Sequence, residues 1–322
     1  MDALFQFGIR ITQSLQTLSP ALDGFMNAVS FLGRIEFFLV FIPFIYWTID
    51  RRIGVRTLLI LIYANFLNTS LKLLFHQPRP YWLGNVKELT IEPTYGIPSS
   101  HASSSISVGG YLITRIKENG TRVVIGVIIL LIGISRLYLG AHFPHDVLFG
   151  WLVGLAVLWA IAKWGEQVIG WLRSKSLSFQ IGIGFANSLL IILIGLLIRL
   201  IISGTPDPAS YSSFSADARS VTLFFTLSGA LFGTASGYAL MRQFARFEST
   251  NIWRIRLIRY AVGIVGLLLI YYGLDVLFAM IAPDESALGY ILRYIRYTLA
   301  TLWATFLAPW FFIKLKLAGS QD

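Results

Sequence analysis

The sequence contains no cysteine and few charged residues. Without cysteine the chain has no disulfide bonds, no thiolate nucleophile and no Cys-ligated metal site. Charged residues make up only 13% of the 322 positions, whereas soluble domains carry about 25%. Hydrophobic residues make up 56%. This balance argues against an ordinary soluble protein, although the length alone would suit two soluble domains.

Long apolar runs instead predict a helical membrane protein. A bilayer core about 30 Å thick is crossed by roughly 20 apolar residues in a helix. The third run, SHASSSISVGGYLIT, is rich in Ser and Gly and is predicted to be a helix packed inside the bundle. The fold class is therefore predicted to be an all-α integral membrane bundle of about nine transmembrane helices. The predicted spans are residues 32–49, 53–75, 99–115, 122–140, 144–162, 179–202, 220–241, 257–281 and 288–313.

The distribution of Lys and Arg predicts the orientation. The connections on one side of these spans hold 16 of the 26 Lys and Arg residues, and those on the other side hold far fewer. Basic loops face the cytoplasm in membrane proteins. The N-terminus is therefore expected outside and the C-terminus in the cytoplasm. The same clustering explains the net charge of +10 without a nucleic-acid partner, because the charges are spread as short clusters between apolar runs.

We expect two parts that pack as one unit. Residues 1–178 would form a catalytic membrane core of spans one to five, and residues 179–322 a C-terminal membrane extension of spans six to nine. The extension carries no recognisable motif. It would stabilise the core, form a homodimer surface or shape the substrate entrance, and the sequence leaves these three roles open.

Residues of catalytic type gather in the predicted core. All four histidines (His76, His101, His142 and His145) lie between residues 76 and 145. Three cations, Lys72, Arg79 and Arg136, fall at the same predicted outer level of the membrane. Charge at this depth is costly and indicates function, and Arg matches the oxygens of phosphate with paired donors. No cluster of carboxylates is present to hold a metal, so we expect a phosphate site without metal or other cofactor.

The remaining predicted site residues suggest the chemistry. Ser99 and Ser100 stand where the third span should begin, and free N–H groups at a helix N-terminus bind anions. Asp146 lies one turn after His142 and can hold its Nδ1–H, which leaves Nε2 free to attack phosphorus. His101 is then expected to protonate the leaving oxygen and later to activate a water.

These residues resemble a known family. Lys72-x6-Arg79-Pro80, Pro98-Ser99-Ser100-His101 and Ser135-Arg136-x5-His142-x3-Asp146 are similar to the three-part signature of the type 2 phosphatidic acid phosphatase superfamily. The resemblance covers about residues 54–160. It implies a metal-independent phosphatase with His142 as nucleophile, His101 as acid and base, and Asp146 as the group that orients His142. The implied phosphate-binding residues are Lys72, Arg79, Ser99, Ser100 and Arg136.

The substrate is left open by conflicting resemblances. The second motif usually reads Pro-Ser-Gly-His, and Ser100 in place of Gly is similar to the sphingosine-phosphate phosphatase branch. ArgProTyrTrp at 79–82, the segment 135–145 and nine spans instead resemble glucose-6-phosphatase. We expect a lipid phosphate monoester or isoprenyl pyrophosphate as substrate, because a pocket at span ends is open to membrane lipids. A sugar phosphatase, a lipid phosphotransferase and a non-catalytic transporter or lipid-binding scaffold are the alternatives. The membrane would be a prokaryotic plasma membrane with the site facing outside, or an endoplasmic reticulum with a luminal site.

Other polar residues are expected to be structural. His76 and His145 lie outside the signature and are predicted to line the site or the surface. Asp275, inside a predicted span, requires a partner, for which Arg199, Arg293 and Arg296 are candidates at the same level.

Overall fold

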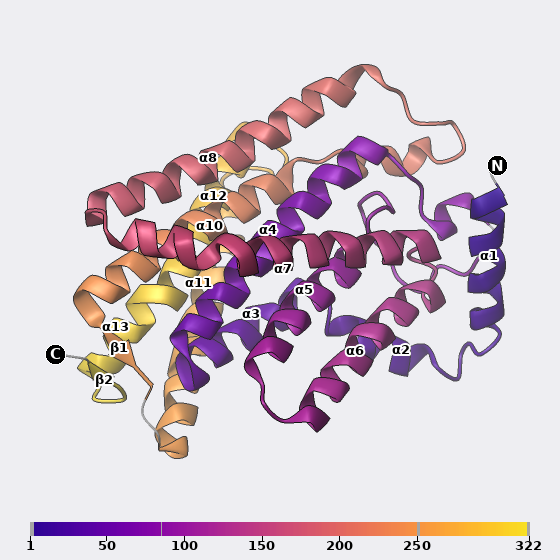
Figure 1. Cartoon of the computed structure of the whole chain (residues 1–322). Coiled ribbons are helices and arrows are strands. Elements are labelled where there is room, and N and C mark those ends of the chain that lie inside the picture. The colour runs from indigo at the N-terminus through magenta and orange to yellow at the C-terminus, as the bar shows by residue number, and fades with distance from the viewer. Residues whose placement is uncertain (1–2, 85, 250–251, 321–322) are drawn as a thin grey trace. The chain divides into compact units, whose positions relative to one another are not determined.

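The computed structural model describes residues 3–84, 86–249 and 252–320, and it is almost entirely helical (Figure 1). A two-residue antiparallel ribbon of β1 (Phe247–Glu248) and β2 (Gly319–Ser320) was not predicted. The helices are α1 (Ala3–Gln16), α2 (Asp23–Phe31), α3 (Ile35–Phe44), α4 (Arg51–Phe75), α5 (Ser100–Arg115), α6 (Asn119–Tyr138), α7 (Pro144–Arg173), α8 (Leu177–Ile201), α9 (Ser215–Ala218), α10 (Thr222–Leu240), α11 (Trp253–Ala279), α12 (Ala287–Leu302) and α13 (Ala308–Lys314). Short 3-10 and π turns extend several of them, including η1 (Ile45–Ile49), η2 (Pro80–Leu83) and η6 (Trp303–Leu307).

The helical membrane class is confirmed, but the number of spans is not. A helix occupies each of the nine predicted spans. In the part of the chain that the structure describes, six helical segments are long and apolar enough to cross a bilayer, and α2 with α3–η1, bent by 51°, would make a seventh. Helix α5 has only 16 residues, and α12, which continues through η6 into α13, is not among these segments. Nine spans and the orientation of the termini therefore stay predictions.

The chain divides into two compact units, which are described separately. Unit 1 consists of Met1–Phe38, Tyr63–Ala162 and Leu196–Ser220. Unit 2 consists of Leu39–Ile62, Lys163–Gly195 and Val221–Asp322. The three predicted motifs all fall in unit 1.

Close packing of α5 on α7 organises unit 1. A Cβ atom added to Gly150 would lie 2.5 Å from the carbonyl oxygen of Ser99, and one added to Gly154 would lie 2.4 Å from that of Ser103. Small residues spaced by four let two helix backbones approach in a membrane. The Ser-rich α5 is accordingly buried over most of its length, as predicted for the third span.

Local sequence signals place the helix ends that border the motifs. The Ser99 side chain caps α5 by accepting from the N–H of Ala102 at 3.4 Å. Helix α6 is followed by Gly140, whose φ of +72° suits a residue without Cβ. Pro144 starts α7, a position where its missing N–H costs nothing. The chain between Arg136 and Asp146 is thus a sharp reversal between two helices.

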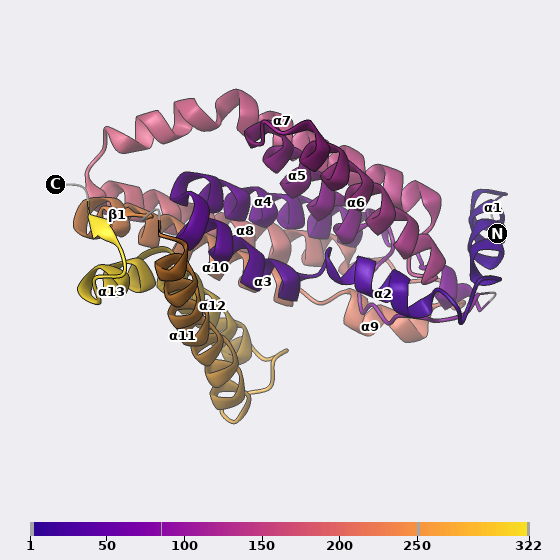
Figure 2. The same ribbon diagram turned by 90° about the horizontal axis from the view of Figure 1, so that it is seen from below.

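Unit 2 is centred on α10 and α12. Added Cβ atoms at Gly229 and Gly233 would lie 2.3 Å and 2.2 Å from the carbonyl oxygens of Tyr294 and Thr298. Helix α11 runs beside α12 (Figure 2). The buried Trp47 joins this unit by donating from Nε1 to the carbonyl oxygen of Ala304 at 2.8 Å.

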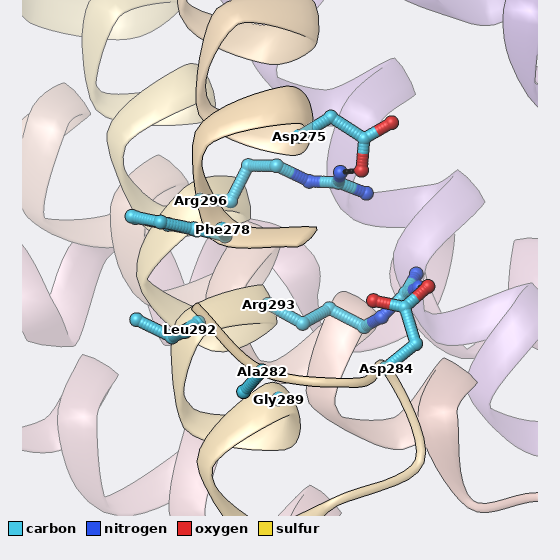
Figure 3. Close-up of a pocket in the computed structure, with 8 residues that line it drawn as sticks. All are labelled: Asp275, Phe278, Ala282, Asp284, Gly289, Leu292, Arg293 and Arg296. Carbon is cyan, nitrogen blue, oxygen red and sulfur yellow. Dashed lines mark hydrogen bonds and ion pairs between the residues drawn. The ribbon is translucent and has the colours of Figure 1, made fainter. Parts of the chain in front are cut away.

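Two ion pairs join α12 to α11 and to the loop between these helices (Figure 3). Arg296 pairs with Asp275, so one of the three candidate partners is the one found. Arg293 pairs with Asp284 at 2.6 Å. The cavity lined by these four side chains measures about 10 Å³, room for at most one water molecule. A structural role for these pairs stays a prediction.

Candidate active site

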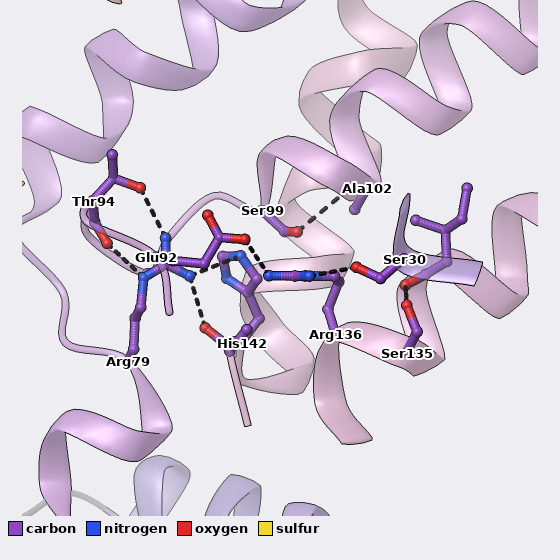
Figure 4. A network of polar contacts seen from close by, with 12 residues as sticks. Ser30, Arg79, Glu92, Thr94, Ser99, Ala102, Ser135, Arg136 and His142 are labelled. Carbon is purple, nitrogen blue, oxygen red and sulfur yellow. Dashed lines mark hydrogen bonds and ion pairs between the residues drawn. The ribbon is translucent and has the colours of Figure 1, made fainter. Parts of the chain in front are cut away.

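Four segments of unit 1 bring the predicted site residues together. They are the end of α4 with η2, the loop before α5, the first turn of α5, and the reversal from α6 to α7. Figure 4 shows Arg79, Arg136 and His142 meeting with Glu92, a residue that the sequence did not single out. The three cations and His142 are almost fully buried.

Arg79 is fully engaged by hydrogen bonds. Its Nε donates to the carbonyl oxygen of Thr94, and one terminal nitrogen donates to the Thr94 hydroxyl and to the carbonyl oxygen of Tyr95. The other terminal nitrogen donates to the carbonyl oxygen of Ala141 at 2.9 Å and to Nε2 of His142 at 3.1 Å. Since guanidinium has five N–H donors, a phosphate must replace one of these partners to bind Arg79.

The contact with Arg79 sets the tautomer of His142. Arginine only donates, so Nε2 of His142 must present its lone pair and the ring proton must sit on Nδ1. Nδ1 lies 3.4 Å from Oδ2 of Asp146, which also accepts from the N–H of Phe143 at 2.9 Å. Burial and the neighbouring Arg79 cation hold the pKa of His142 well below its usual range. His142 is therefore a neutral imidazole with an unprotonated Nε2.

Asp146 is held at the start of α7 by several groups. Its main-chain carbonyl accepts from the N–H of Ser99 at 2.9 Å, which ties α7 to the α5 N-terminus. Nε2 of His145 lies 3.3 Å from its Oδ1. An added Cβ at Gly96 would lie 2.6 Å from the carbonyl oxygen of Pro78 and 3.1 Å from Oδ2, so a residue without a side chain is needed beside this carboxylate.

Lys72 and Arg136 complete the cation group but are bound differently. The Lys72 ammonium donates to the carbonyl oxygens of Tyr95 and Gly96, at 2.5 Å and 3.0 Å. Arg136 donates to the Ser30 hydroxyl and pairs with Glu92, each at 2.5 Å. Its Nε has no partner among the described residues. Arg136 therefore keeps free donors that Arg79 lacks.

The residues in the first turn of α5 differ in which of their groups are available to bind a substrate. His101 is buried, and its Nε2 has no hydrogen-bond partner among the described residues. Ser99 uses its hydroxyl as the helix cap. The hydroxyl of Ser100 lies 2.8 Å from Oδ1 of Asn68, so only the main-chain N–H of Ser100 is available to an anion. His76, outside the signature, contacts Tyr95 at a ring-centroid distance of 5.2 Å.

Possible metal ligands do not gather in the described part of the chain, where no three His, Asp or Glu side chains form a suitable group.

Comparison with protein families decides the assignment. The model of the PAP2 superfamily matches residues 53–169. A second model, described as the PAP2 superfamily phosphatase transmembrane extension, matches residues 225–320. Together they match more than half of the chain. The chain belongs to the PAP2 superfamily. The resemblance noted in the sequence is thereby confirmed at the level of the superfamily.

Individual relatives differ in their substrates. Mouse (Mus musculus) glucose-6-phosphatase 3 is 29% identical over 50% of this chain and 54% of its own length. Mouse sphingosine-1-phosphate phosphatase 2 is 30% identical over 47% of this chain and 44% of its own length. The chain thus spans about half the length of these relatives. A solved PAP2-type phosphatidylglycerolphosphate phosphatase from Bacillus subtilis is 25% identical over 52% of this chain and 89% of that one, with a TM-score of 0.45.

Within this PAP2 protein, Glu92 and Thr94 were missed by sequence reasoning. Glu92 pairs with Arg136, and Thr94 accepts two hydrogen bonds from Arg79. A signal for Glu92 existed, because it is the only charged residue between positions 89 and 100. Thr94 has no comparable signal, since an uncharged loop residue is ordinary.

The linker after α8 was also missed as a support of the site. Asp207 accepts from the Tyr95 hydroxyl at 2.8 Å and pairs with Arg219 at the same distance. Phe214 stacks on Trp82 with ring centroids 5.0 Å apart. The carbonyl of Tyr95 binds both Lys72 and Arg79, so this linker holds the segment that positions two cations of the PAP2 signature.

Proposed function

We propose that the chain is a membrane-embedded phosphatase that hydrolyses a lipid phosphate monoester or isoprenyl pyrophosphate through a phosphohistidine on His142. The observation that carries this proposal is the position of the His142 imidazole between two groups. Arg79 faces the lone pair of Nε2, and Asp146 faces Nδ1. A histidine held in this way is an oriented nucleophile in a cationic environment.

The reaction then has two steps. Nε2 of His142 attacks phosphorus, the P–O bond to the leaving group breaks, and protonated His101 gives its proton to the leaving oxygen. A water then attacks phosphorus while neutral His101 takes its proton, and the P–N bond breaks to release inorganic phosphate and restore His142. As Nε2 forms its bond to phosphorus, the donor of Arg79 that it occupied becomes free for a phosphoryl oxygen.

The proposed phosphate-binding groups are Lys72, Arg79, Arg136, the main-chain N–H of Ser100 and the hydroxyl of Ser99, which accepts from Ala102 and can still donate its own hydrogen. Positive charge around the transferring phosphoryl group stabilises its transition state. Support for Arg136 comes from its free donors, and support for the α5 N-terminus comes from its fixed position beside the main-chain carbonyl of Asp146. None of these steps needs a metal.

Two substrate classes follow from the relatives. Sphingosine-1-phosphate phosphatase 2 and the Arabidopsis thaliana lipid phosphate phosphatase delta favour a lipid phosphate. Glucose-6-phosphatase 3 favours a sugar phosphate, which is the second candidate. We place the site on the non-cytoplasmic side of the membrane, on the basis of the Lys and Arg distribution. A prokaryotic plasma membrane is the proposed location, with an endoplasmic reticulum as the alternative.

Phosphate release by the purified full chain in detergent tests the proposal. The substrates are phosphatidic acid, sphingosine 1-phosphate, an isoprenyl pyrophosphate and glucose 6-phosphate, each assayed with EDTA present. We expect turnover of at least one by the wild type, none by His142→Ala, and inhibition by vanadate. No release by folded wild-type protein, or activity that only added metal restores after EDTA, would overturn the proposal.

A further inference from the structure

Glu92 introduces a negative charge into the proposed phosphate site. Its carboxylate pairs with Arg136 at 2.5 Å, and Figure 4 shows it between Arg79 and Arg136. Burial alone would raise the pKa of Glu92, but Arg136 and Arg79 outweigh burial and lower it to about 2. Glu92 is thus ionised at any pH at which the protein is assayed.

The side chain of Glu92 is more exposed than those of the cations around it. The side chain of Arg136 is 0% exposed and that of Glu92 is 21% exposed. Lys72, Arg79 and His142 are all buried. Glu92 therefore lies at the outer edge of the site, between the buried cations and the exterior of the protein.

Glu92 can stay near Arg136 when a phosphate binds, because Arg136 keeps a free Nε donor for the phosphate. The main chain at Glu92 is held in place, since its N–H donates to the Tyr81 hydroxyl at 3.1 Å and its carbonyl accepts from that hydroxyl at 3.0 Å. The side chain can move by rotating its own bonds, whereas its backbone stays. After phosphate binds, the carboxylate therefore remains at the edge of the site.

The leaving group should point toward this edge. Phosphoryl transfer proceeds with the attacking and leaving atoms roughly in line. His142 attacks from the buried side, so the group attached to the ester oxygen extends toward the exposed side, where Glu92 lies, while the ester oxygen itself must stay within reach of the buried His101. A carboxylate there attracts a hydrogen-bond donor or a cation and repels a second anion.

We propose that Glu92 selects the substrate by its leaving group, which rests on the proposed function. It favours phosphate monoesters whose alcohol carries a hydroxyl or ammonium group near the phosphate. It disfavours substrates with a second phosphate, such as isoprenyl pyrophosphate. Sphingoid-base phosphates and sugar phosphates share the favoured chemistry.

The test compares selectivity in wild type, Glu92→Gln and the matched control Glu88→Gln. Glu88 is an exposed acid four residues earlier in the same loop, so its variant makes the same change of charge outside the site. The measured quantity is kcat/KM for sphingosine 1-phosphate and for glucose 6-phosphate, each divided by kcat/KM for farnesyl pyrophosphate. If one of these is not hydrolysed, its inhibition constant against a hydrolysed substrate takes the place of kcat/KM.

We expect Glu92→Gln to lower at least one of these two ratios on the order of tenfold, because a full charge is removed near the leaving group. Glu88→Gln should keep the wild-type ratios. The sphingosine and glucose arms show whether the favoured donor belongs to a lipid or to a sugar.

Equal loss on all substrates in Glu92→Gln would overturn the inference, since it would mean that Glu92 only orients Arg136. Unchanged ratios would overturn it as well. If Glu92→Gln does not fold, Glu92→Asp is measured instead. This substitution shortens the side chain by one methylene and moves the carboxylate away from the leaving group, so the ratios should shift in the same direction by a smaller factor. Unchanged ratios would again overturn the inference. Absence of turnover in the wild type is a different result, because it contradicts the proposed function itself.

Discussion

Helix α7 in unit 1 and helix α10 in unit 2 use the same device for packing. Each carries glycines four residues apart that lie against carbonyl oxygens of a partner helix. The partner of α7 is α5, which begins with the capped Ser99 and the buried His101. The partner of α10 is α12, whose contacting carbonyls belong to Tyr294 and Thr298. Close helix packing is thus common to both units, and only in unit 1 does it position residues of catalytic type.

The buried arginines Arg136 and Arg296 give a second comparison between the two units. Each forms an ion pair with one carboxylate, Glu92 in unit 1 and Asp275 in unit 2. Arg296 also lies over the ring of Tyr271, 5.2 Å from its centroid. A buried arginine is therefore not evidence of a phosphate site by itself. The neighbouring His142 and Arg79 distinguish Arg136.

The largest expected effect tests whether phosphatase activity depends on the histidine of the signature and not on a histidine outside it. His142→Ala should lower kcat by at least about 10³-fold, because the proposed nucleophile is removed. His76→Ala serves as the control, since His76 lies in the same unit but outside the signature. Phosphate release and thermal unfolding of both variants are the measurements. Comparable loss of activity in the two variants would remove the distinction between signature and surroundings.

The next effect compares the two arginines. Arg136→Ala should lower kcat/KM by about 10²–10³-fold, the typical cost of losing one donor to the transition state. Arg296→Ala should keep wild-type kcat/KM but lower the unfolding free energy by about 1–3 kcal/mol, because its ion pair is lost. Kinetics and detergent-based thermal unfolding measure these quantities. The comparison fails if Arg296→Ala loses activity as Arg136→Ala does.

The glycine pairs give a smaller effect. Gly154→Leu and Gly233→Leu should each lower stability by about 1–3 kcal/mol through overpacking. Gly154→Leu should in addition lower kcat, because α5 is displaced together with Ser99 and His101. Stability and kcat are measured for both variants. If Gly233→Leu, at equal loss of stability, lowers kcat as much as Gly154→Leu, packing in unit 1 has no special role in positioning.

The smallest expected effect is a shift in pH dependence. The pKa of His142 is lowered by burial and by Arg79, and the unprotonated imidazole is the reactive form. Activity is therefore present above the lowered pKa and is lost as the pH falls through it, so the acid limb of kcat/KM should lie below about 6.5. Arg79→Gln should move this limb upward, whereas Arg79→Lys should leave it in place. A wild-type limb at or above 6.5 would contradict the assignment.

Much of the fold could be predicted because helix formation in a membrane is a local property. Apolar runs of sufficient length predicted helices at all nine positions. The predicted spans 99–115 and 144–162 begin within one residue of the starts of α5 and α7. The number of spans was not settled in this way. Whether α5, or α12 with η6 and α13, crosses a bilayer depends on what surrounds each segment as well as on its own composition.

The candidate site could be predicted as a set of residues but not as a network. The spacing of three motifs identified Lys72, Arg79, Arg136, His101, His142 and Asp146. It could not show that Arg79 is saturated by hydrogen bonds or that Ser100 turns its hydroxyl toward Asn68. Hydrogen-bond partners depend on which loop folds over the site, and the course of that loop cannot be predicted from the sequence.

The sequence by itself predicted the membrane class and the helical segments, which the structure confirms, and it named the candidate reactive side chains. Hydropathy, helix-end signals and motif spacing act within a few tens of residues, so they can be read directly. Only the tertiary structure decided that Glu92 pairs with Arg136, 44 positions away, and that Asp275 pairs with Arg296 rather than Arg293. Buried charges pair with whichever partner the packing brings within a few ångströms, because an unpaired charge in a low-dielectric interior is too costly.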